Sequence, residues 1–143
     1  MGIEQLAPLA GEWEMSVDIP GADHLRGRVV FEWMSGNQLL IERTEIPDPN
    51  VPDGLCVVAA RDDGTFVQHY FDSRGVVRVY DMTFDGQTWT LSRTKEDFTP
   101  LHFQQRYTGR ISVDGDVIDG VWEASDDGAN WRRDFGLAYR RQR

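Results

Sequence analysis

Four charged side chains and one tyrosine stand inside segments that otherwise have the apolar pattern of buried strands. They are Glu32, Glu42, Arg106, Tyr107 and Glu123. If the charged groups point into the interior, each needs a partner, and a Glu–Arg network lining a cavity would supply one. An apolar pocket with a few convergent polar groups is the usual form of a ligand site. The alternative is that they face water as cross-strand pairs, and strand alternation leaves both interpretations open.

His69 is a further polar side chain in an apolar segment, because alternation puts it on one face with Val67 and Phe71. One interpretation is a core histidine with satisfied hydrogen bonds, and the other is a ligand-contacting or catalytic histidine. The remaining histidines, His24 and His102, have no metal-ligand spacing relative to it. We therefore expect no metal site.

Motifs for nucleophilic or cofactor chemistry are absent from the sequence, which has no Gly-x-Ser-x-Gly, no P-loop and no Gly-x-Gly-x-x-Gly. We expect no cofactor, and the catalytic residues, if any exist, are unknown at this stage. The single cysteine, Cys56, lies in the apolar run 55–58, which is typical of an inert core thiol. One cysteine cannot form an internal disulfide, which agrees with a reducing compartment.

Length and charge narrow the classes of function. The 143 residues fit one domain, 1–143, with a core of its own. A formal net charge of −9 argues against a nucleic-acid or anionic-membrane partner, since both need a cationic face. No apolar run is long enough for a membrane span, and no secretory signal is visible at the N-terminus. We expect a cytoplasmic protein.

The elements that must position these side chains are mainly strands. In residues 11–20, apolar side chains alternate with polar ones without a break, which predicts a strand with one buried face. A short helical turn over residues 3–10, ended by Gly11, precedes it. Similar runs between turn residues predict ten strands in all. The expected ranges are 11–20, 26–34, 37–46, 55–61, 65–73, 76–83, 87–96, 101–113, 116–125 and 130–141.

Short turn-forming links such as Asp85-Gly86 and Asp114-Gly115 join these strands and predict an up-and-down antiparallel meander. Closure into a barrel removes both sheet edges and buries the apolar face. The sequence therefore predicts an all-β fold, a single ten-stranded antiparallel up-and-down barrel. The one long link, residues 47–54, is interpreted as a surface loop, with folding across a barrel mouth as the alternative.

Several short motifs carry a family resemblance. Gly11-x-Trp13 resembles the opening of calycin barrels, in which the Trp packs beside an Arg from the last strand, here Arg132, Arg133 or Arg140. Over nearly its whole length the chain resembles the DUF1579-type lipocalin-like proteins, which implies a barrel with a small-molecule cavity and no particular reaction. The matching features are Leu9-x-Gly11-x-Trp13, Gly36 with Leu39-Leu40, Tyr70-Phe71-Asp72-Ser73-x-Gly75, Asp85-Gly86-x-x-Trp89, Glu123-x-Ser125-x-Asp127-Gly128-x-x-Trp131 and Tyr139-Arg140-Arg141.

The chain also resembles the nitrobindin-type haem barrels in length and ten-strand topology. Those proteins place a ligating His late in the chain, whereas the last histidine here is His102, and the residues after Trp13 depart from the nitrobindin pattern. Haem binding is therefore only an alternative.

We expect the barrel to bind a small, mostly apolar molecule in its interior, with Arg106 or His69 fixing a polar end. A second hypothesis is a cofactor-free isomerase or cyclase that positions its substrate in the same cavity. A third is a structural barrel filled by side chains, with an outer face that forms a homodimer.

Overall fold

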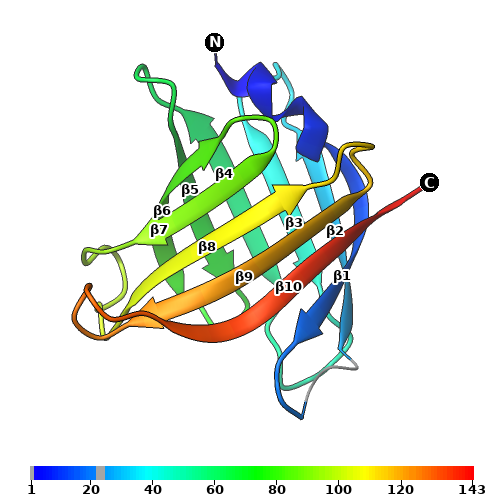
Figure 1. The fold of residues 1–143 in the computed structure, drawn as a ribbon. Coiled ribbons are helices and arrows are strands. Elements are labelled where there is room, and N and C mark those ends of the chain that lie inside the picture. The colour runs from blue at the N-terminus through cyan, green and yellow to red at the C-terminus, as the bar shows by residue number, and fades with distance from the viewer. Residues whose placement is uncertain (1, 22–24) are drawn as a thin grey trace.

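The computed structural model describes residues 2–21 and 25–143, which form a closed barrel behind a short N-terminal helix (Figure 1). The elements are η1 (Ile3–Leu9), β1 (Gly11–Asp18), β2 (Arg26–Trp33), β3 (Leu40–Glu45), β4 (Gly54–Ala60), β5 (Phe66–Asp72), β6 (Val77–Phe84), β7 (Thr88–Arg93), β8 (Gln104–Ile111), β9 (Val117–Ser125) and β10 (Arg132–Gln142).

Each strand pairs antiparallel with its neighbours in sequence, and β1 also pairs with β10, which closes the sheet. The predicted ten-stranded antiparallel barrel and its N-terminal helical turn are confirmed, the turn being a 3-10 helix. No helical segment in the described residues has the length and apolar character needed to cross a membrane.

The connection between β7 and β8 is longer than expected. The predicted strands were 87–96 and 101–113, whereas residues 94–103 form a loop in the structure. Arg93, which is buried, donates to both carboxylate oxygens of Asp97 at 2.9 Å and to the Thr99 carbonyl at 2.6 Å. This ion pair holds the pKa of Asp97 well below its usual range. The loop is thus fixed to the barrel wall by a buried charge pair.

One half of the barrel interior is filled. The helix η1 covers the end at which β1 begins, and its Ile3, Leu6 and Leu9 are buried against the core. Trp13 and Phe31 continue this packing inward, and both are essentially inaccessible to solvent. The alternation predicted for the first strand is therefore confirmed, with its apolar face directed into the barrel.

Arg141 joins the helix to the last strand. Its guanidinium lies 4.1 Å from the Trp13 ring centroid and donates to the carbonyls of Pro8 and Ala10 at 2.7 and 2.8 Å. The expectation of Arg132, Arg133 or Arg140 in this role was wrong. In the register of β1 and β10, Trp13 is opposite Arg141, and directly opposite residues share one face of the sheet.

We expect Arg141→Ala to lower the free energy of unfolding by about 3 kcal/mol, because it removes a stacked cation together with charge-assisted hydrogen bonds to carbonyls. Arg140→Ala is the matched control, since Arg140 is exposed, and it should change stability by less than about 0.5 kcal/mol. Urea unfolding followed by Trp fluorescence measures both. Equal losses in the two variants would contradict a clamping role for Arg141.

Candidate functional site

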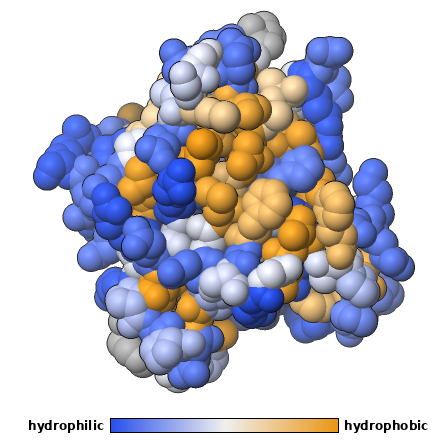
Figure 2. Space-filling view, turned by 180° about the vertical axis from the view of Figure 1, so that it is seen from behind, coloured by the Kyte–Doolittle hydropathy of each residue, from blue (hydrophilic) through white to orange (hydrophobic). Residues whose placement is uncertain are grey.

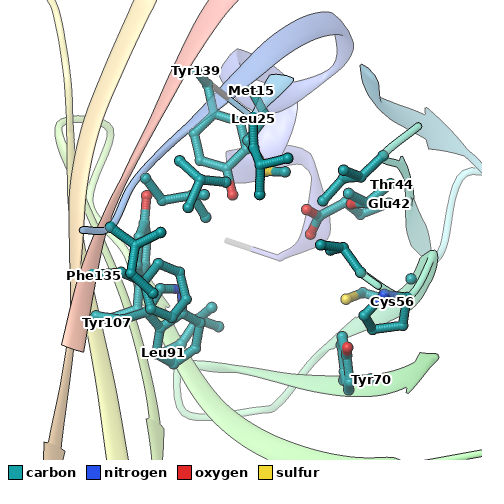
Figure 3. A pocket seen from close by; sticks show the side chains of 18 of the residues that line it. Met15, Leu25, Glu42, Thr44, Cys56, Tyr70, Leu91, Tyr107, Phe135 and Tyr139 are labelled. Carbon is teal, nitrogen blue, oxygen red and sulfur yellow. The ribbon is translucent and has the colours of Figure 1, made fainter. Parts of the chain in front are cut away.

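The other half of the barrel is hollow. Its cavity has a volume of about 450 Å³ and is lined by inward side chains of most strands and by residues of two links. Figure 3 shows several of these side chains around the open space. The lining residues are Met15, Val17, Ile19, Leu25, Glu42, Thr44, Ile46, Val51, Pro52, Gly54, Cys56, Gln68, Tyr70, Trp89, Leu91, Tyr107, Trp122, Phe135, Leu137 and Tyr139.

The link between β3 and β4 forms part of the cavity wall. Val51 and Pro52 line the cavity, so this proline-rich segment is more than the plain surface loop of the first interpretation. Asp53 joins the end of this link to its start and to the turn after β5: its carboxylate accepts from the Ile46 amide at 3.1 Å, and its own amide donates to the Ser73 hydroxyl at 3.1 Å. Together with Ile19 and Leu25 of the β1–β2 link, these residues place apolar surface at the end opposite η1.

Glu42 supplies the carboxyl group of the described cavity lining. It lies on the inner face of β3, opposite Cys56 on β4, and it is buried. Loss of hydration raises the pKa of its carboxyl to about 7, against a hydrogen bond with the Cys56 thiol that acts in the opposite direction. The same burial and the neighbouring Glu42 raise the pKa of the Cys56 thiol well above its usual range. At neutral pH the Glu42 carboxyl is therefore present in both its neutral and its ionised form.

An aromatic wall faces Glu42 across the cavity (Figure 3). Tyr107 packs edge-on against Trp89 with ring centroids 5.0 Å apart, and the Trp89 and Tyr139 centroids are 5.9 Å apart. Burial raises the pKa of both tyrosines, so their phenols stay neutral. Tyr107 lies over a glycine, since a Cβ at Gly120 would be 2.1 Å from its hydroxyl oxygen. The sequence Gly-Val-Trp on β9 thus makes room for the ring.

Three buried polar atoms of cavity-lining residues have no hydrogen-bond partner within the described part of the chain. They are the Gln68 side-chain oxygen, the Trp89 indole nitrogen and the Tyr107 hydroxyl. A buried polar group without a partner costs free energy. The fourth such atom among the described residues, Arg78 Nε, belongs to a residue outside the cavity lining, so most but not all of these groups lie around the cavity.

A bulge in β10 adds an aromatic side chain that the sequence patterns missed. Arg133 is opposite Glu123, but the register then shifts, and Phe135 is opposite Trp122 with ring centroids 6.4 Å apart. Asp134 is thereby left out of the ladder. Without the extra residue, Asp134 would be opposite Trp122 and would point into the cavity. The bulge therefore keeps a second carboxylate away from the interior.

Of the six site residues expected from the sequence, Glu42 and Tyr107 line the cavity. Glu32, Arg106 and Glu123 do not. Arg43 donates to Glu32 at 2.7 Å on the outer surface, and Arg106 donates to Glu123 at 2.8 Å, with its guanidinium 4.1 Å from the Trp131 ring. On each of these strands an adjacent aromatic residue takes the inner face, and alternation turns the charged one outward. The Glu–Arg pairing exists, but as cross-strand pairs outside the barrel.

His69 also faces outward. Its partners in register are Val57 and Val79, while Gln68 and Tyr70 of the same strand line the cavity. The expectation that His69 fixes a ligand was wrong, because β5 is apolar on both faces and sequence alternation does not reveal which one is inside. The outer face of β4–β6 is correspondingly rich in apolar side chains, and apolar residues gather near the middle of the view in Figure 2.

A histidine-ligated haem does not fit the described histidines, because His69 lies on the outer face and His102 is exposed in the loop before β8. His24 lies outside the described residues. Within residues 2–21 and 25–143, no group of three or more His, Cys, Asp or Glu side chains is close enough together to hold a metal ion.

A second hollow of about 580 Å³ lies outside the barrel, along β1, β8, β9 and β10. Charged side chains line much of it, and Arg133 donates to Asp18 there at 2.9 Å. Such pairs at a solvated surface form without a ligand. The interior cavity is therefore the stronger candidate site.

We expect Glu42→Gln to stabilise the protein relative to wild type increasingly as pH rises from 4.5 to 7. The folded state holds the Glu42 proton up to a pKa of about 7, against a usual value of 4.5, so wild type loses stability across that window while the amide variant does not. The difference should reach about 3 kcal/mol above pH 7.

Urea unfolding of both proteins between pH 4.5 and 8 measures this difference. Glu32→Gln serves as the control, because it removes one carboxylate from the outer surface and leaves the interior unchanged. A gap between wild type and Glu42→Gln that stays constant over this range would show that Glu42 is solvated rather than buried.

Comparisons with known proteins support the fold alone. No family model matches the chain. No curated protein matches it either. Among solved structures, the chain is similar to the crystal structure of Rv2717c from M. tuberculosis, with a TM-score of 0.67 and 16% sequence identity over 99% of this chain and 97% of that one. This likeness extends over the whole barrel, and at that identity it shows a shared architecture.

Proposed function

We propose that this protein binds a small, mostly apolar molecule inside its barrel. The observation that carries the proposal is the hollow half of the interior, because its volume of about 450 Å³ lies in the usual range for ligand pockets, roughly 300–1,000 Å³. A barrel with a purely structural role would be filled by side chains throughout, as it is around Trp13 at the η1 end.

The lining supports an apolar body for the ligand. Most of the lining side chains are aliphatic or aromatic, and the described lining contains neither Lys nor Arg. Apolar residues of the β1–β2 and β3–β4 links, including Leu25 and Val51, continue this surface to the end opposite η1. Transfer of an apolar molecule from water to such a surface is favourable in proportion to the area it buries.

A second candidate function is proton-transfer catalysis in the same cavity, as in a cofactor-free isomerase or cyclase. Glu42 favours it, because a carboxyl with a pKa of about 7 can both accept and donate a proton at neutral pH. Incubation of unsaturated ketones with the protein in heavy water tests it. Deuterium incorporation that Glu42→Gln abolishes would support catalysis, and incorporation at the buffer rate would exclude it for those ketones.

Three expectations from the sequence stay predictions: membership of the DUF1579-type lipocalin-like group, a cytoplasmic location and a homodimer. Light scattering coupled to size exclusion decides the last of these. The absence of a nucleic-acid partner is likewise a prediction from net charge.

We expect Leu137→Trp to weaken binding of phenylnaphthylamine, a neutral apolar fluorophore, by tenfold or more, because the larger side chain occupies the cavity that Leu137 lines. Ala138→Trp is the matched control. Ala138 is the next residue of β10, and alternation directs it to the outer face, so its variant should bind like wild type. Titration followed by fluorophore emission measures both affinities. Equal affinity in the two variants would place the binding surface outside the barrel.

A further inference from the structure

We propose that the ligand is an amine, a small apolar molecule whose ammonium group pairs with Glu42. This inference rests on the proposed binding function and specifies the chemistry of the polar end. It is carried by the position of one buried carboxyl in a cavity whose described lining supplies no cation.

The first support is the missing counter-charge. Ion pairs elsewhere in the barrel join Glu32 to Arg43 and Asp97 to Arg93, whereas Glu42 has only the neutral Cys56 thiol as a hydrogen-bonding side chain among the described residues. A buried carboxylate is normally paired with a cation, because it loses its hydration without compensation otherwise. An ammonium group in the cavity would supply the charge that the fold leaves out.

The second support is the wall opposite Glu42. Figure 3 shows the Glu42 carboxyl directed into the open space, with Tyr139 and Tyr107 across from it and Tyr70 on its own side beyond Cys56. The faces of such rings attract cations, more strongly where water is excluded. Burial raises the pKa of each of the three phenols, so none of them ionises near neutral pH. The cavity thus combines an acid with aromatic rings, the two kinds of group that recognise ammonium ions.

The third support is the field of the whole molecule. The formal net charge of −9 attracts cations and repels anions. A fatty-acid-like carboxylate would meet this field and then Glu42, with no lining Lys or Arg to pair with it in the described residues. A neutral alcohol would be tolerated, but it would leave ionised Glu42 without a counter-charge.

The test uses three probes with one naphthyl body and different heads: naphthylmethylamine, naphthylmethanol and naphthoate. We expect the amine to bind wild type about tenfold tighter than the alcohol at pH 7.5, and naphthoate to bind weakest. In Glu42→Gln the advantage of the amine over the alcohol should disappear, whereas Glu32→Gln should keep it. Calorimetric titration measures these affinities.

Proton release on binding is an independent test of the pairing between the ammonium group and Glu42. An alkylammonium stays protonated at neutral pH, so it should bind the ionised form of Glu42 and expel the proton that part of the population carries. Affinity for the amine should therefore rise between pH 6 and 8. Calorimetry in two buffers of different ionisation enthalpy should show proton release with the amine and none with the alcohol.

An alcohol or carboxylate that binds wild type as tightly as the amine would overturn the proposal, and so would an amine advantage that survives Glu42→Gln. The proposed binding function fails separately, if neither phenylnaphthylamine nor any of the three naphthyl probes enters the barrel of the wild-type protein.

Discussion

Antiparallel pairing of β1 with β10 is the constraint on which the rest of this structure depends. It leaves none of the ten strands at an edge, and it assigns every side chain of the barrel to the inside or the outside. The same register brings Arg141 over Trp13, and through the carbonyls of Pro8 and Ala10 the guanidinium fixes η1 against the end of the barrel. The strand pairing that closes the barrel therefore also positions the arginine that holds η1 over one end.

Side chains fill the barrel interior at the η1 end, and the candidate site lies in the other half. Around η1 the inward side chains are large and packed together, whereas beyond Met15 the interior opens into the cavity. Glu42 is the only Asp or Glu among the lining residues that the structure describes, and the β10 bulge keeps Asp134 outside. A single carboxyl in an apolar, aromatic cavity is costly in the empty protein. The proposed ammonium ligand would offset that cost by pairing with the carboxylate.

The sequence predicted the barrel well because its evidence is local: alternation within each strand and turn residues between them. It could not fix which face is inside where both faces of a strand are apolar, and this is why His69 and Glu32 were expected inside but face outward. Glu42 and Tyr107 do line the cavity, and their part in ligand binding stays a prediction. The role of Arg141 and the inward position of Phe135 depend on register, which is set by pairing between strands distant in the chain. A bulge of one residue leaves no mark that alternation alone would reveal.

We propose that Glu42 is the buried polar end of a ligand cavity. The most direct measurement follows the side-chain carboxyl carbon of Glu42 by NMR across pH, without and with naphthylmethylamine. We predict a titration midpoint near pH 7 in the free protein, shifted down by at least one unit when the amine is bound. A midpoint near the usual value of 4.5 in the free protein, or one that the amine leaves unchanged, would contradict it.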